Sequence, residues 1–188
     1  ETLSELVELK VGGLLPDGNN QGSHILLLKI PQRSKFLPIW IGPAEASSIA
    51  MVLRGQAFER PLTHDLLQHC IEGLGATVQR VVVTTIQDDT FFARIFIERG
   101  DEIVSVDARP SDCVALAVRV RCPIYCSAEL LESQSDHLVE VDEIEAEIAG
   151  PPPVQLPKGS ADDALRELMR QVERGEEDPR EEDPPSED

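Results

Sequence analysis

The sequence repeats itself once over a long segment, and this feature constrains the fold more than any other. When the 188-residue chain is shifted by 67 residues, residues 24–54 align with residues 91–121 without a gap, and Pro43 falls on Pro110. Both segments show the pattern of a strand, a turn, a strand and a helix that begins at proline, which the first turn of a helix tolerates. Since a further strand precedes each copy, we predict two β-β-β-α units; chance similarity between two hairpin–helix segments is the alternative.

Hydrophobic periodicity places short strands and amphipathic helices along the chain. The expected strands cover residues 6–11, 24–30, 36–41, 77–86, 90–98, 102–107 and 123–126. Helices are expected over residues 44–54 and 110–120, with a short helical turn at 128–131. A further helix is expected to begin at an N-cap at Thr63 and to stop at Gly73 and Gly75. We therefore predict an α+β fold with mixed and antiparallel sheets and a few helices.

Composition changes sharply after the first two thirds of the chain. Residues 1–133 carry a net charge of −5, whereas residues 134–188 carry −13 of the total of −18, so the acidity belongs mainly to the C-terminal part. We predict a domain over 1–133, an acidic extension over 134–150 that could add an edge strand, a proline-rich linker over 151–160, a short amphipathic helix over 161–174 and a disordered acidic tail over 175–188.

Several classes of protein are excluded by the sequence. No apolar run approaches the roughly 20 residues of a membrane span, and no signal peptide is visible, so we expect no membrane association. The four cysteines form no CxxC pair, which favours free thiols and a cytoplasmic location. Cys70 and Cys113 fall in apolar helical patterns and are expected in the core. Trp40, on a strand, is expected in the core rather than as a platform for stacking bases.

Polar side chains gather at the expected N-termini of two helices, where free backbone N–H groups bind anions. Carboxylates can hold Mg²⁺ or Mn²⁺, a histidine can move a proton and arginines can grip phosphate, which are the groups that phosphodiester hydrolysis uses. The same residues could instead serve only to cap helices, complement helix dipoles and form ion pairs. The two clusters are Arg60, Thr63, His64 and Asp65, and Asp107, Arg109, Ser111 and Asp112, with Glu45 at the repeat position of Asp112.

Three motifs resemble the bifunctional nuclease family of bacteria and plants. They are L-P-I-W-I-G-P-A-E-A at 37–46, R-P-L-T-H-D-L at 60–66 and V-D-A-R-P-S-D-C-V-A-L-A at 106–117, within a similarity over roughly 5–132. Cys113 stands where the family usually has alanine. The resemblance implies an α+β fold with a duplicated strand-rich unit, nuclease activity on DNA and RNA, and a homodimer or larger homo-oligomer.

Our first hypothesis is a broad-specificity nuclease that hydrolyses DNA or RNA with the assistance of a metal. In this hypothesis His64 is the general base or orients water, and Arg60 and Arg109 stabilise the charge of the phosphorane. The Mg²⁺ or Mn²⁺ ligands would be Asp107 and Asp65, with Asp112 or Glu45.

Two further hypotheses use the same residues without catalysis. The first is a module that binds an anionic ligand or nucleotide, which the net charge of −5 on residues 1–133 and the lack of a basic stripe favour over avid nucleic-acid binding. The second is an oligomeric regulatory or assembly protein, in which these side chains support the fold and the contacts between copies.

Overall fold

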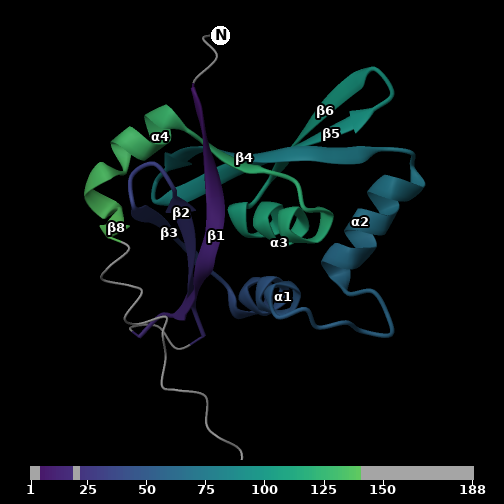
Figure 1. The fold of residues 1–188 in the computed structure, drawn as a ribbon, viewed down its shortest axis with the longest axis horizontal. Helices are drawn as coiled ribbons and strands as arrows, with labels where there is room; N and C mark the ends of the chain where they lie inside the picture. The colour runs from purple at the N-terminus through teal and green to yellow at the C-terminus, as the bar shows by residue number, and fades with distance from the viewer. Residues whose placement is uncertain (1–4, 19–21, 141–188) are drawn as a thin grey trace, which may run out of the picture. The chain divides into compact units, whose positions relative to one another are not determined.

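Eight strands form one mixed sheet in the computed structural model, which describes residues 5–18 and 22–140 (Figure 1). The strands lie in the order β6-β5-β4-β7-β1-β2-β3-β8, and all pairs are antiparallel except the parallel pair β4 and β7. Their bounds are β1 Leu6–Pro16, β2 His24–Ile30, β3 Lys35–Ile41, β4 Thr77–Gln87, β5 Thr90–Arg99, β6 Glu102–Ala108, β7 Ile124–Ser127 and β8 Val139–Glu140.

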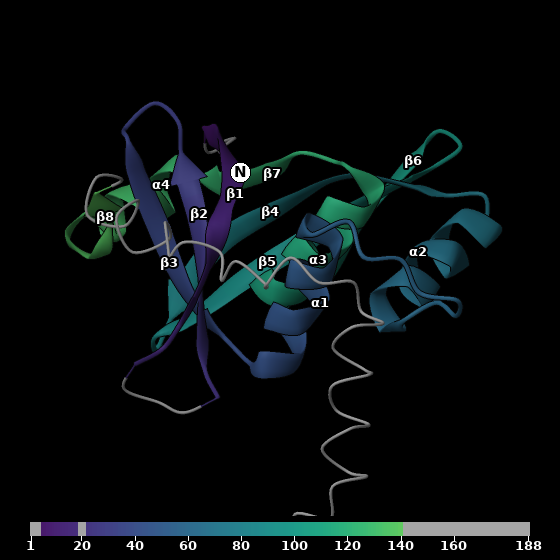
Figure 2. The same ribbon diagram turned by 60° about the horizontal axis from the view of Figure 1, so that its bottom comes forward.

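Helix α3 (Pro110–Val120) is the centre of the helical layer (Figures 1 and 2). Its small and apolar side chains recur at helical spacing, and seven of its 11 residues are buried. It contacts α1 (Pro43–Leu53) and α2 (Thr63–Gly73) and packs on β4 and β5. A short helix, α4 (Ala128–Ser133), contacts β7 and is followed by a 3₁₀ turn at Ser135–His137. The predicted α+β class is confirmed.

Strand β1 joins the two halves of the sheet. Its first residues, from Leu6 to Leu9, pair with β7, and its later residues, from Lys10, pair with β2. The register with β2 shifts near Gly12, where an added Cβ would lie 2.2 Å from Cε1 of Phe36. Glycine therefore lets β1 pass close to the buried Phe36 ring, which is 2% exposed.

The two segments of the sequence repeat have the same order of elements. Under the 67-residue shift, the bounds of β3 coincide with those of β6, and the bounds of α1 coincide with those of α3. The predicted β-β-β-α order is thus present in both segments, because β1 precedes one and β4 the other. Coincident bounds do not establish common descent, so the internal duplication stays a prediction.

The chain divides into the units Glu1–Ala149 and Gly150–Asp188. The expected linker over 151–160, helix over 161–174 and tail over 175–188 lie outside the described residues, as does the acidic extension from residue 141. Before that point, β8 pairs with β3 at the edge of the sheet. No helix among residues 5–18 and 22–140 is long and apolar enough to cross a membrane.

Three local expectations are wrong. Trp40 is 58% exposed, because its neighbours Ile39 and Ile41 point to the covered face of β3 and Trp40 therefore points to the opposite one. Cys70 is exposed on α2, whereas Cys113 is buried as expected; all four cysteines are free, and the cytoplasmic location stays a prediction. Thr63 does not cap α2, since the N-cap is Leu62.

Replacing Gly12 with alanine should destabilise the protein. The added methyl group would overlap the ring of Phe36, and we expect the free energy of unfolding to fall by about 1–3 kcal/mol as the core shifts. Chemical denaturation measures this loss. Gly18→Ala is the matched control, because no atom lies within 4 Å of its added Cβ. Equal stabilities of the two variants would contradict the role given to Gly12.

The predicted homo-oligomer can be tested at the outer edge of β6. This strand forms the edge of the described sheet, and Ile103, Val104 and Val106 on it are exposed. Unpaired strand edges with exposed apolar side chains are sites where a second copy can pair. We expect Val104→Lys to raise the dimer dissociation constant about tenfold by light scattering, whereas Leu74→Lys, at a more exposed site directly after α2, leaves it unchanged. A monomeric wild type would refute the prediction.

Candidate active site

His64 lies at the centre of a hydrogen-bonded chain that connects three helices. Its Nδ1 is 2.9 Å from Oγ of Ser48 on α1, and its Nε2 is 3.1 Å from Oδ1 of Asp112 on α3. The imidazole is 12% exposed. Serine, histidine and aspartate therefore meet from positions far apart in the sequence.

The charge of Asp112 sets the direction of these hydrogen bonds. Burial raises the pKa of Asp112, but hydrogen bonds from Arg109 and His64 and the positive charge of Arg109 outweigh it and hold the pKa below its usual range. An ionised carboxylate only accepts hydrogen bonds, so Nε2 of His64 carries a proton in this arrangement. In the neutral ring Nδ1 is then the acceptor, and the Ser48 hydroxyl donates to it. The chain runs from Ser48 through His64 to Asp112.

Arg109 joins two carboxylates at the edge of this chain. Its Nε and Nη2 donate to the two oxygens of Asp112 at 2.7 and 3.0 Å, and Nη2 also lies 2.8 Å from Oε1 of Glu45. The hydrogen bonds and charge of Asp112, reinforced by Glu45, raise the pKa of Arg109 above its usual value. The Arg109 side chain is 65% exposed, so it remains accessible to an anion.

These residues line a cavity of about 530 Å³. A proton acceptor (His64), a hydroxyl group (Ser48) and an accessible cation (Arg109) thus line the same cavity. These are the groups that nucleophilic attack on a phosphoryl or acyl centre requires. The lining consists of Ala44, Glu45, Ser47, Ser48, Met51, Pro61, Leu62, Thr63, His64, Arg109 and Asp112.

Asp65, although adjacent to His64, serves a different set of contacts. Its Oδ1 accepts from Nε of Arg119 at 2.6 Å, and its Oδ2 accepts from the backbone N–H of Leu62 at 2.8 Å. Burial raises the pKa of Asp65, but the bonds from Arg119 and Leu62 outweigh it and lower the pKa. Arg119 is 4% exposed and also donates to the carbonyl oxygens of Ala115 and Ser48. This pair therefore connects α2 and α3 with α1.

The remaining predicted residues lie elsewhere. Arg60 is exposed in the loop between α1 and α2, and Asp107 is exposed on β6 opposite Arg94 of β5; neither lines the cavity. Ser111 is buried at the start of α3.

The predicted metal ligands do not fit a divalent cation as the structure places them. Glu45 and Asp112 pair with Arg109, and Asp65 pairs with Arg119. Within the described part of the chain, no three His, Cys, Asp or Glu side chains are placed to hold a metal ion together. We therefore assign no chemical step to a metal.

Sequence reasoning missed Ser48 and Arg119. Ser48 follows Glu45 by three positions and so shares its face of α1, a spacing that could have drawn attention to it. Arg119 is the one charged residue in the apolar segment 113–120. A lone charge in such a helix signals a buried ion pair, although the sequence does not identify the partner.

Replacing Asp65 with asparagine should leave Arg119 without a counter-charge. We expect the free energy of unfolding at pH 7 to fall by about 2–4 kcal/mol, since a mostly buried pair would lose one partner. The folded pKa of Asp65 lies below its ordinary 3.8, so the contribution of the carboxylate is present above that value and is lost as the pH falls through the folded pKa. The difference from wild type should shrink below about pH 4, as urea denaturation would show. A pH-independent difference, or an equal loss in the exposed control Asp101→Asn, would contradict this account.

Comparisons with known proteins agree with the motifs. The chain is 40% identical over 124 residues to an uncharacterized protein of Mycobacterium tuberculosis, covering 66% of this chain and 73% of that protein. It is 26% identical over 136 residues to bifunctional nuclease 1 of Arabidopsis thaliana, covering 71% of this chain and 42% of that relative. It is 28% identical over 134 residues to bifunctional nuclease 2 of the same plant, covering 69% of this chain and 40% of that relative. The chain thus spans less than half the length of these plant relatives. Residues 26–138 match the bifunctional nuclease domain, and the chain belongs to that family.

Proposed function

We propose that the protein is a nuclease that hydrolyses phosphodiester bonds of DNA or RNA at the cavity containing His64. The observation that carries this proposal is the hydrogen-bonded chain from Ser48 through His64 to Asp112, which lines a cavity together with the exposed Arg109. Two plant relatives are called bifunctional nucleases, which supports the same reaction class.

In the first step Ser48 is the nucleophile. His64 Nδ1 takes the hydroxyl proton as Oγ bonds to phosphorus, and the bond between phosphorus and the leaving sugar oxygen breaks. The leaving oxygen then receives the proton from His64. Asp112 stabilises the positive charge on the imidazole during the transfer, and Arg109 keeps Asp112 ionised.

In the second step water releases the product. A water oxygen bonds to phosphorus, the bond between phosphorus and Oγ breaks, and His64 passes the proton of the water to Ser48. The released strand carries the phosphate, and the enzyme returns to its starting state. This route uses one proton acceptor twice, as covalent catalysis with a histidine base requires.

Arg109 is the group that we assign to the phosphate. Its planar guanidinium holds Asp112 through two hydrogen bonds but contacts Glu45 through one nitrogen, so a phosphate oxygen would displace Glu45 at lower cost. Charge developing on the phosphoryl oxygens would then face a fixed cation.

Cleavage of labelled single- and double-stranded DNA and RNA tests the proposal. We expect His64→Gln and Ser48→Ala to lower the single-turnover rate at least about 100-fold. Their matched controls are His69→Gln, which alters an exposed histidine of α2, and Ser47→Ala, which removes the neighbouring hydroxyl of the same cavity. Both controls should stay within about twofold of wild type. Arms with Mg²⁺, Mn²⁺ and EDTA test the metal dependence predicted from the sequence.

The variants separate the parts of the proposal. If Ser48→Ala retains the rate while His64→Gln loses it, water is the direct nucleophile and the covalent step is wrong. Equal rates in wild type and all variants would show that the cleavage does not arise from this cavity. Oligonucleotide binding without cleavage under any condition would favour the module that binds an anionic ligand.

A further inference from the structure

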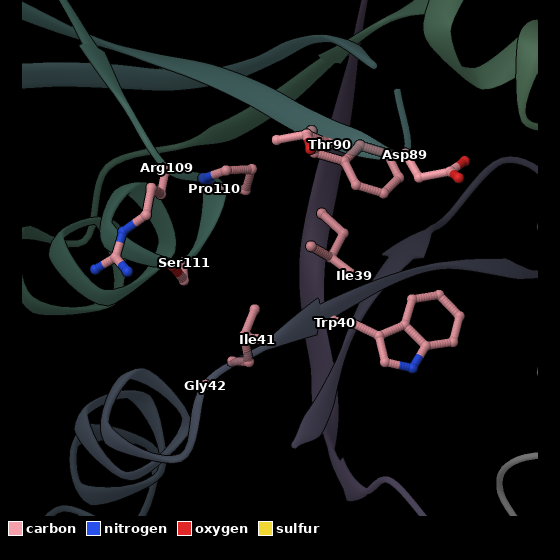
Figure 3. A pocket seen from close by; sticks show the side chains of 10 residues that line it. Ile39, Trp40, Ile41, Gly42, Asp89, Thr90, Arg109, Pro110 and Ser111 are labelled. Atoms are coloured by element: carbon pink, nitrogen blue, oxygen red, sulfur yellow. The ribbon is translucent and has the colours of Figure 1, made fainter. Parts of the chain in front are cut away.

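A second cavity, of about 300 Å³, adjoins the candidate active site (Figure 3). It lies between the end of β3, the turn from β4 to β5 and the start of α3. Arg109 lines both cavities, so the two spaces meet at one cation. Any strand whose phosphate contacts Arg109 would therefore extend into this second cavity or pass its entrance.

Trp40 is among the residues that line this cavity, and its exposed side chain lies on the face of β3 opposite to Ile39 and Ile41. Its side chain is 58% exposed, and it is the one tryptophan of the chain. In Figure 3 Ile39 and Ile41 point into the space beside Arg109, and the indole of Trp40 extends outward at the far end of the cavity. Stacking on an exposed aromatic ring is the principal way in which proteins hold unpaired bases without reading their sequence.

The turn between β4 and β5 places polar groups at the same cavity. Asp88 and Asp89 both have positive φ, 48° and 58°, which forms a tight two-residue hairpin between Gln87 and Thr90. Asp89 and Thr90 of this turn both line the cavity, and Asp89 lies on the side away from Arg109. A carboxylate repels phosphate but accepts hydrogen bonds from the amino and hydroxyl groups of a nucleoside. The polarity of the cavity thus places a phosphate at Arg109 and a nucleoside toward Asp89.

We infer that this second cavity is a subsite for one unpaired nucleotide of a single-stranded nucleic acid. The base stacks on Trp40, its polar edge or sugar faces Asp89 and Thr90, and its phosphate contacts Arg109 beside the cavity of His64. This inference rests on the proposed function, because it places the nucleotide next to the bond to be cleaved. The expected substrate is single-stranded nucleic acid, since a base within a duplex stacks on its neighbours and has no free face.

Binding can be measured apart from cleavage. The His64→Gln background is used throughout so that the probe is not consumed, and circular dichroism checks that each variant folds. The probes are a short oligothymidylate, an abasic strand with the same number of phosphates and a hairpin duplex. Because Trp40 is the single tryptophan, quenching of its fluorescence reports directly on stacking.

We expect the oligothymidylate to quench Trp40 and to bind about tenfold more tightly than the abasic strand. Trp40→Ala should abolish this difference, by anisotropy of the labelled strands, and Trp40→Tyr should retain most of it. Phe58→Ala, which removes another exposed aromatic ring outside both cavities, is the matched control and should change nothing. Equal binding of the oligothymidylate and the abasic strand, or tighter binding of the duplex, would overturn the inference.

The outcomes distinguish this subsite from the proposed reaction. Base-dependent binding at Trp40 in a protein whose wild type does not cleave would support the subsite and refute the nuclease. Cleavage of single strands with an unchanged KM in Trp40→Ala would overturn the subsite alone. Failure of every probe to bind would overturn both.

Discussion

The ion pair between Arg119 and Asp65 is the interaction on which the candidate active site depends. A guanidinium that is 4% exposed is stable only if its charge and its donors are satisfied, because removing a charge from water costs several kcal/mol. Arg119 meets this requirement with a carboxylate of α2, a carbonyl of α3 and the carbonyl of Ser48 on α1. The same helices carry the side chains of Ser48, His64 and Asp112. Satisfying one buried cation therefore also aligns the three groups of the proposed reaction.

Most of the negative charge of the chain lies outside the residues that form the candidate site. The formal charge is −18, yet residues 1–133 contribute only −5. At the cavity two carboxylates, Glu45 and Asp112, surround the single cation Arg109 and keep it in a defined orientation. Phosphate binding of this kind would be weak and local, unlike that of proteins with basic surfaces. Base stacking on Trp40 would add affinity for the nucleic acid without further positive charge at either cavity.

Many residues of the candidate site could be predicted from the sequence, but the role of each residue could not. Glu45, His64, Arg109 and Asp112 were predicted and lie together at one cavity. Asp65 carried the same signal, an acidic residue in the first turn of a helix, and forms a buried ion pair instead. Arg60 and Asp107 do not line that cavity. Capping, ion pairing and catalysis use the same residue types at helix N-termini, so position along the helix does not separate them.

The strands, the helices and the helix ends where polar groups gather could be predicted from the sequence, because these follow from periodicity, proline, glycine and charge within a few residues. The sequence also marked the three family motifs. The tertiary structure decided the partners: His64 meets Asp112 across 48 residues, and Asp65 meets Arg119 across 54. It also placed Ser48 on the imidazole and turned Trp40 outward. These outcomes depend on how α1, α2 and α3 pack on one another, and local propensity contains no information about contacts between distant helices.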